Sequence, residues 1–238
     1  MKAIILAAGI GKRLYPLTKE RPKCMLDVGG KPILEYILES INFAGISEAV
    51  IVVGPQKEMI EKKFGKKFGN VKLTYVYNEL YQSTNNLRSL WCAREQLTDE
   101  FIQIHGDLVL NKEIVKLACS SKVKNGVLIT KDHIHFVVDG NRVLLDGDII
   151  SDINKTSSWD YSEGRAFGIY KFSKLAASAY RDIIDSEKNN FKDGFEKALL
   201  PMLKKFEFKV IDINKLSFSE IDDLNDLNEA NKKVKTII

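Results

Sequence analysis

Apolar and polar positions along the chain predict short buried strands separated by amphipathic helices. Residues 1–8 form an apolar run rich in branched side chains, and a polar loop containing glycines follows at once. Residues 32–44 carry apolar side chains three and four positions apart, which predicts a helix that ends at Gly45. Residues 49–53 predict a second buried strand, and residues 56–64 a short helix.

The same alternation continues towards the middle of the chain. Residues 73–77 alternate as expected for a strand at a sheet edge, residues 85–97 predict a helix, and residues 101–105 predict a strand that runs into Gly106 and Asp107. Strands separated by helices predict βαβ units, and so a Rossmann-like α/β fold with a mainly parallel sheet flanked by helices. Ligands of such sheets bind at the carboxyl ends of the strands, so the first loop and Asp107 are expected at one site.

The second half of the chain has a less regular pattern. Residues 136–145 predict a hairpin with Asp139-Gly140 at its turn, and residues 151–163 are polar and rich in turn-forming residues. Because no linker or repeat is visible, we expect one domain over residues 1–238, with a small hairpin and loop subregion in its second half. The remaining expected elements are strands at 127–130, 167–170 and 208–213 and helices at 175–184, 191–206 and 224–234.

Composition narrows the class of protein. The 238 residues are 45% hydrophobic and 29% charged, with a net charge of +4, which is typical of a soluble globular protein. The lysine-rich stretches are short, so no nucleic-acid partner is expected. The first apolar run is too short for a signal peptide or a membrane span, and Cys24, Cys92 and Cys119 are scattered as free thiols usually are. These features predict a cytoplasmic protein without a membrane span.

The loop after the first strand has the chemistry of a phosphate site. Gly9 and Gly11 let the backbone turn tightly and present amide groups to anionic oxygens. Lys12, Arg13 and Lys23 add positive charge. The loop therefore predicts a polyphosphate ligand, although a turn that uses its glycines for geometry alone also explains the Gly-x-Gly pair.

Two better-known phosphate loops do not match. A dinucleotide fingerprint requires a third glycine where Leu14 stands, and it requires an acidic residue after the second strand, where Gly54-Pro55 follows. A P-loop requires Ser or Thr after Gly-Lys, and here Arg13 follows Gly11-Lys12.

A longer pattern is more specific. The residues Leu6-Ala7-Ala8-Gly9-x-Gly11-x-Arg13-Leu14-x-Pro16-Leu17-Thr18, then Pro22-Lys23 and Gly30-Lys31-Pro32, resemble the signature of the nucleotidyltransferase family. That family joins a nucleoside triphosphate to a sugar 1-phosphate or an alcohol phosphate. The resemblance implies that Arg13, Lys23 and Asp107 are catalytic. It also implies that the nucleotide is bound by Leu6, Ala8, Gly9, Gly11, Lys12, Arg13 and Lys23.

The reaction of this family predicts a metal site. An acceptor oxygen attacks the α-phosphorus while pyrophosphate leaves, and a divalent ion stabilises the growing charge. Mg²⁺ usually takes one or two protein carboxylates. The resemblance implies Asp107 and Asp222 as these ligands. Asp107 could equally be a turn residue, and Asp223 competes with Asp222, because one of the two could simply cap the last helix.

A second segment points to one branch of the family. Asn78-Glu79-x-Tyr81-x-x-Thr84-Asn85-Asn86 resembles the cytidylyltransferase branch that acts on choline phosphate and related small phosphates or phosphonates. The resemblance implies CTP as the nucleotide. The hydroxyl and amide groups of Thr84, Asn85 and Asn86 suit the edge of a pyrimidine, with Tyr81 beside them. A helix cap at Thr84 or Asn85 explains the same residues without a ligand.

The acceptor site is expected in the second half. An aromatic face with a nearby carboxylate suits an ammonium group, and Trp159, Asp160 and Tyr161 provide both. Asp193 and Glu196 could add negative charge. Packing of Trp159 and an exposed helix start at 193–196 are the alternatives.

The sequence is therefore interpreted as a magnesium-dependent transferase that moves CMP from CTP to a small phosphorylated alcohol or phosphonate, with choline phosphate as the first candidate. A sugar-1-phosphate uridylyl- or thymidylyltransferase and a non-catalytic nucleotide-binding regulatory subunit remain alternatives. The acceptor, the base preference and a homodimer stay open.

Overall fold

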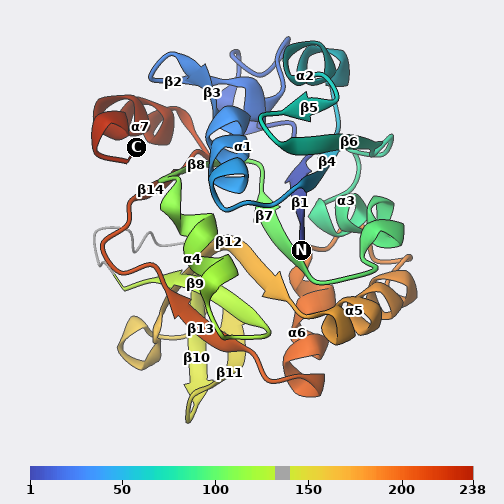
Figure 1. Ribbon diagram of the computed structural model, residues 1–238, viewed down its shortest axis with the longest axis vertical. Coiled ribbons are helices and arrows are strands. Elements are labelled where there is room, and N and C mark those ends of the chain that lie inside the picture. Colours follow the sequence, from blue (N-terminus) through green and yellow to red (C-terminus); the bar gives the residue numbers. More distant parts are fainter. Residues whose placement is uncertain (132–139, 238) are drawn as a thin grey trace.

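The computed structural model describes residues 1–131 and 140–237. Within them, a ten-stranded mixed sheet crosses the molecule, with helices on both of its faces (Figure 1). The four strands at the centre run parallel, in the order β7, β1, β4, β6. They span Phe101–His105, Lys2–Ala7, Glu48–Val53 and Val71–Tyr77. This block confirms the predicted α/β class, and all four strands were expected from the sequence.

The strands of the second half join this block through one long strand. β12 (Gly164–Phe172) pairs antiparallel with β9 along one edge, while β10 and β7 pair antiparallel with successive parts of its other edge. β10 (Asn141–Asp146) continues into β11 (Ile149–Asn154), and β9 (Gly126–Thr130) pairs with β13 (Lys209–Asp212). The molecule therefore has a parallel half and a largely antiparallel half that share the β7–β12 boundary.

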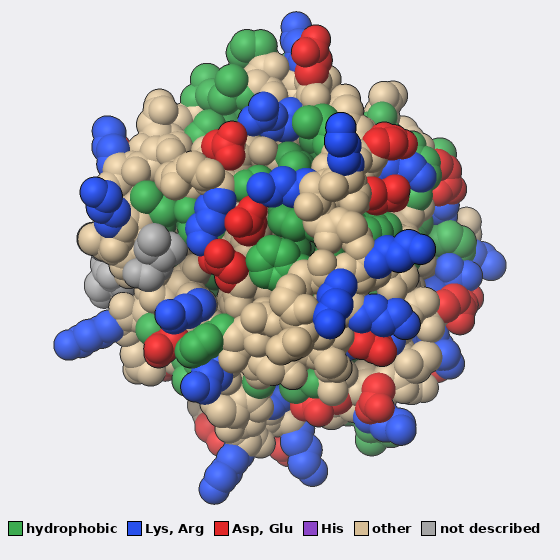
Figure 2. Space-filling model, turned by 45° about the horizontal axis from the view of Figure 1, so that its top comes forward, with side chains coloured by type: hydrophobic (Ala, Val, Ile, Leu, Met, Phe, Trp, Pro, Cys, Tyr) green, Lys and Arg blue, Asp and Glu red, His purple; other side chains and the backbone are tan. Residues whose placement is uncertain are grey.

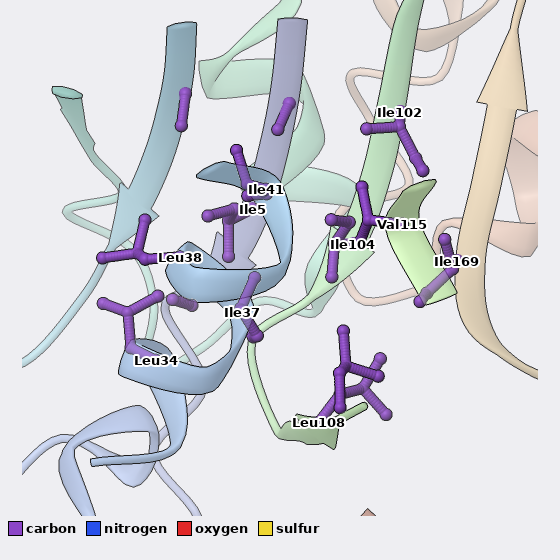
Figure 3. Close-up of a cluster of buried hydrophobic side chains, with 14 of the residues drawn as sticks. Ile5, Leu34, Ile37, Leu38, Ile41, Ile102, Ile104, Leu108, Val115 and Ile169 are labelled. Atoms are coloured by element: carbon purple, nitrogen blue, oxygen red, sulfur yellow. The ribbon is translucent and has the colours of Figure 1, made fainter. Parts of the chain in front are cut away.

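Helices cover both faces because the central strands are apolar on both sides. Ile5 of β1 points towards one layer, and its neighbours Ile4 and Leu6 point towards the other. On the first face, Leu34 and Ile37 belong to the apolar stripe of α1 that packs over the sheet (Figure 3). Helices of the first face are α1 (Ile33–Phe43), α2 (Lys57–Phe64) and α4 (Glu113–Ser120), and those of the second are α3 (Asn86–Cys92), α5 (Lys174–Ser186) and α6 (Glu196–Lys205).

The last helix packs against the beginning of the chain. α7 (Leu224–Ile237) places Leu227 and Val234 in a buried cluster with Leu14 and Val28. Asn231 accepts a hydrogen bond from the Gly29 amide at 3.0 Å. The loop that follows β1 is therefore supported by residues from the other end of the sequence.

Two predictions for the second half are wrong in detail, and a third lies partly outside the described residues. That third one is the hairpin expected at 136–145; within the described residues, β10 pairs with β11. β11 lies in a stretch assigned to turns, because Ile150 and Ile153 are buried in the layer beneath it. The helix expected from residue 191 begins at Glu196, since the backbone before it is bonded to the start of α3.

Some elements gave little signal in the sequence. α4 was not expected, and the helix expected at 85–97 is α3 followed by a short 3₁₀ turn at Arg94–Gln96. The short strands β2 (Asp27–Val28), β3 (Lys31–Pro32), β5 (Lys67–Phe68), β8 (Leu108–Leu110) and β14 (Phe218–Glu220) were also missed. β5 covers the edge of β6, which the alternation had placed at the border of the sheet.

Candidate active site

A lysine between two aspartates lies at the carboxyl edge of the parallel strands. Lys23 Nζ donates hydrogen bonds to Asp107 Oδ2 at 2.8 Å and to Asp222 Oδ1 at 2.9 Å. Arg13 Nη2 lies 3.1 Å from the same Asp222 oxygen. The structure thus brings together three distant segments that the sequence assigned to one site.

The charges of this cluster stabilise each other. Burial alone would lower the pKa of Lys23, but the carboxylates of Asp107 and Asp222 outweigh it and raise that pKa above its usual range. Burial opposes ionisation of Asp107, and Lys23 outweighs this effect, so the pKa of Asp107 is lowered. At neutral pH the lysine is therefore cationic and Asp107 is ionised.

The two neighbouring aspartates at the start of α7 have different environments. Asp223 Oδ1 accepts the backbone N–H groups of Asn225 at 2.8 Å and of Asp226 at 3.1 Å, as an N-cap does. Asp222 instead contacts Lys23. Capping therefore accounts for Asp223, and Asp222 is the carboxylate that faces the site.

The two site carboxylates fit a magnesium ion. Asp107 Oδ1 is buried and has no hydrogen-bond partner within the described part of the chain, while Lys23 occupies only its other oxygen. In the part of the chain that the structure describes, no cluster of three or more His, Cys, Asp or Glu side chains could hold a metal. Mg²⁺ is commonly held by one or two carboxylates together with water and phosphate oxygens. Asp107 and Asp222 match that donor set.

The glycine-rich loop after β1 and this cluster enclose a cavity of about 290 Å³. Gly11 adopts φ +68°, a left-handed conformation that favours glycine. Its carbonyl accepts a hydrogen bond from Thr18 Oγ1 at 2.7 Å, which holds the loop in place. The lining residues are Leu6, Ala7, Gly9, Gly11, Lys12, Arg13, Lys23, Cys24, Gly106, Asp107 and Asp222.

A second cavity, of about 360 Å³, is lined by several of the same residues. It contains the predicted residues Leu6, Ala8, Gly9, Gly11, Lys12, Tyr81, Thr84, Asn85, Asn86 and Asp107. The structure therefore places every predicted nucleotide-binding residue in one or both of the two cavities. Five further residues line the second cavity and were not predicted to bind a ligand, although Asn78 and Ser89 belong to the segment that resembles the cytidylyltransferase branch: Ile10, Asn78, Gln82, Ser89 and His105.

The polar residues of the second cavity also hold the local structure. Thr84 Oγ1 donates to the Leu80 carbonyl at 2.7 Å, and Asn85 Oδ1 accepts the Asn86 N–H at 2.8 Å. Asn86 Oδ1 accepts the backbone N–H of Phe195 at 2.6 Å. Capping and ligand binding are compatible here, since each bond uses one polar atom of a residue that lines the cavity.

The predicted acceptor residues are not all brought together. The Trp159 ring lies 4.2 Å from Arg142 Cζ, a cation–π contact, and Tyr161 is 83% exposed. Asp160 and Asp193 are also exposed. None of these four lines the two cavities described above. Glu196 does not line them either, but its carboxylate lies over Gly194, close to the cavity-lining Asn86.

Two charged neighbours of the site were missed. Glu220 of β14 forms an ion pair with Arg165 of β12, and β14 pairs with β8 directly after Asp107. Burial, and then the charge of Asp107, raise the pKa of Glu220 to about 7, although Arg165 opposes this. β14 spans only residues 218–220, and three residues are too few for an apolar and polar alternation to predict a strand that carries Glu220.

His105 was passed over although it ends a predicted strand. Burial lowers its pKa, and its ring lies edge-on to Phe195 with centroids 5.0 Å apart. Alternation along β7 puts it on the same face as Gln103, and its position two residues before Asp107 was a usable signal.

Residues 2–134, more than half of the chain, match the model of the family described as nucleotidyl transferase. The chain belongs to this family. The CTP:phosphoglutamine cytidylyltransferase of Campylobacter jejuni is 27% identical, covering 95% of this chain and 98% of that protein. The CMP-5'-(3-aminopropyl)phosphonate synthase of Streptomyces rubellomurinus is 33% identical over 131 residues, 55% of this chain but 21% of that protein.

A solved nucleotidyl transferase has a similar structure. The CTP:phosphocholine cytidylyltransferase from Streptococcus pneumoniae matches with a TM-score of 0.79 and 27% identity, over 98% of each chain. On the face of the present protein shown in Figure 2, acidic and basic side chains are intermingled. Across the described residues, every helix is too short or too polar to cross a bilayer.

Proposed function

We propose that this nucleotidyl transferase moves CMP from CTP to a small acceptor that carries a phosphate or phosphonate and an ammonium group, with release of pyrophosphate. The observation that carries the proposal is Lys23 held between Asp107 and Asp222 beside a glycine-rich loop. The three similar proteins named above are cytidylyl enzymes, which supports CTP as the donor. Choline phosphate is the first acceptor that the sequence suggests.

The residues of the first cavity divide the work of the reaction. The backbone amides of the loop and Arg13 bind the triphosphate, and Lys23 neutralises charge where the acceptor oxygen attacks the α-phosphorus. Lys23 is kept cationic by its two carboxylate partners. Asp107 and Asp222 would hold Mg²⁺, which supplies charge stabilisation for the phosphates when bound.

The second cavity suits a cytosine base. Cytosine offers acceptor atoms and an exocyclic amine along one edge. Asn85 and Asn86 use their carbonyl oxygens for capping, so their amide nitrogens can face such acceptors. The oxygen of Thr84, whose proton goes to Leu80, can accept from the amine. This set supports a pyrimidine ligand.

The alternatives fit the site less well. A non-catalytic nucleotide-binding subunit has no need of two carboxylates around a buried lysine. A sugar 1-phosphate presents hydroxyl groups, and the charged Glu196 near the cavity is better suited to a cation.

Pyrophosphate release tests the proposal directly. The purified protein is assayed with CTP, UTP, ATP and GTP, each with choline phosphate, ethanolamine phosphate and glucose 1-phosphate. We expect turnover with CTP and an amine-bearing phosphate, and its loss with EDTA. A preference for UTP with glucose 1-phosphate would contradict the proposal and indicate a sugar-1-phosphate uridylyltransferase.

A further inference from the structure

We propose that the acceptor carries an ammonium group with N–H bonds, as a primary amine does, and that Glu196, Tyr170 and His105 bind it. This inference rests on the proposed function and narrows its acceptor class. It also places the acceptor site in the layer beneath α6, whereas the sequence had suggested the region of Trp159.

The carboxylate of Glu196 lies close to Asn86, a residue of the second cavity. A Cβ atom added at Gly194 would come within 2.2 Å of Glu196 Oε2 and 3.7 Å of Asn86 Oδ1, so the Glu196 side chain folds back over this glycine and Asn86 lies near it. Asn141 Nδ2 approaches the other oxygen of Glu196 at 3.4 Å. Asn86 and His105 line the second cavity and Glu196 does not, so an ammonium group held at the His105 wall, apart from the cytosine base, would lie near this negative charge.

Two buried polar atoms accompany this carboxylate. Tyr170 OH and His105 Nε2 have no hydrogen-bond partner in the described ranges, 1–131 and 140–237. Their rings lie 6.2 Å apart, and both pack against Phe195, the residue before Glu196, with centroids 5.0 Å away. Buried polar groups without partners are uncommon, because each one loses its bond to water. Because His105 lines the second cavity and Tyr170 lies next to His105, these atoms indicate groups that a ligand satisfies.

The number and type of these polar atoms favour a primary ammonium group over a trimethylammonium group. A primary ammonium has three N–H donors, which a carboxylate, a phenol oxygen and an imidazole nitrogen can accept. A trimethylammonium group has none, so it would leave Tyr170 and His105 unsatisfied. The faces of Tyr170 and Phe195 could still contact methyl groups, but the buried polar atoms argue for N–H bonds.

A matched pair of acceptors tests the inference. Ethanolamine phosphate and choline phosphate differ only in three methyl groups, and 3,3-dimethylbutyl phosphate is the uncharged analogue of choline phosphate. With CTP and Mg²⁺, we expect kcat/KM for ethanolamine phosphate to exceed that for choline phosphate by roughly tenfold or more. The uncharged ester should be the poorest acceptor of the three.

The hydroxyl of Tyr170 provides the matched variant. Tyr170→Phe removes one oxygen and should reduce the ethanolamine-to-choline ratio of kcat/KM roughly tenfold, through the KM of the amine, with the KM of CTP unchanged. Tyr75→Phe is the control, because it removes a hydroxyl that donates to Gly65 far from the site, at 2.7 Å. Circular dichroism checks that both variants fold. If Tyr170→Phe does not fold, the ratio of kcat/KM for the two acceptors in the wild-type protein still tests the inference.

Three results would contradict the inference in distinguishable ways. Choline phosphate preferred over ethanolamine phosphate would overturn it and leave the proposed function standing. Equal use of the uncharged ester would remove the ammonium from the acceptor class altogether. Absence of CMP transfer to every acceptor would reject the proposed function, and the inference with it.

Discussion

The proposed nucleotide side and the proposed acceptor side of this molecule are built differently. On the nucleotide side, β1 runs directly into the loop of Gly9 to Lys23, so one continuous stretch supplies most of the groups proposed to bind phosphate. On the acceptor side, the polar groups come singly from β7, β12 and α6. A parallel sheet concentrates ligands at its carboxyl edge, whereas an antiparallel region builds a pocket from isolated side chains. The first kind of site can be recognised in a sequence and the second cannot.

The largest expected effect removes the charge on which the nucleotide side depends. Lys23→Ala should lower kcat by about 10²–10³, because it deletes a cation that acts on the transition state. Lys62→Ala, in the exposed part of α2, is the control. Steady-state pyrophosphate release measures both. Near-normal turnover of a folded Lys23→Ala protein would contradict the role given to this lysine.

The second prediction separates the metal carboxylates from their capping neighbour. Asp107→Asn and Asp222→Asn should each raise the Mg²⁺ concentration needed for half-maximal activity by roughly tenfold or more, because an amide is a poorer ligand. Asp223→Asn should leave this requirement unchanged, since its carboxylate caps α7. A magnesium titration of the three variants decides the matter. A shifted requirement in Asp223→Asn alone would reverse the assignment.

The third prediction locates the acceptor pocket. Glu196→Gln should raise the acceptor KM about tenfold and leave that of CTP unchanged, since a charge-assisted contact is lost. Trp159→Ala should change the acceptor KM less than threefold, roughly the scale of an exposed cation–π contact, because Arg142 already covers one face of its ring. A larger increase of the acceptor KM in Trp159→Ala than in Glu196→Gln would indicate that the acceptor binds at Trp159.

The smallest expected effect lies at the junction of the two sides. Asn86 lines the nucleotide cavity and caps the start of α6 through Phe195. Asn86→Ala should lower the free energy of unfolding by about 1 kcal/mol and raise the KM of both substrates by a few-fold. Urea unfolding and two-substrate kinetics measure these changes. An effect on CTP alone would show that the two sides are independent.

The parallel half was predicted well because its strands are long, apolar and separated by clear helices. The phosphate loop and Asp107 followed from the position of ligands in such sheets. Asp222 was harder, because the choice between it and Asp223 depends on which carboxylate caps α7, and only coordinates show that.

The acceptor half resisted prediction for a physical reason. Glu196 was proposed from the sequence as a source of negative charge, but its place near Asn86 depends on the contact of Asn86 with Phe195, residues 109 positions apart. His105 and Tyr170 come together because β7 and β12 are neighbours, which periodicity does not reveal. The Trp159 group looked like a pocket in sequence because its residues are adjacent, but adjacency along a chain does not make a cavity.

The packing of α7 on the first loop has a consequence for the order of synthesis. Asp222 lies 199 residues after Lys23, and it reaches the lysine once the segment before α7 is in place. A ribosome adding about 5–20 residues per second needs roughly 10–40 s to cover that distance. During this interval Lys23 of a nascent chain still lacks its second carboxylate. The cluster of Lys23, Asp107 and Asp222 is therefore complete only after residue 222 has been added and has folded back onto the β1 loop.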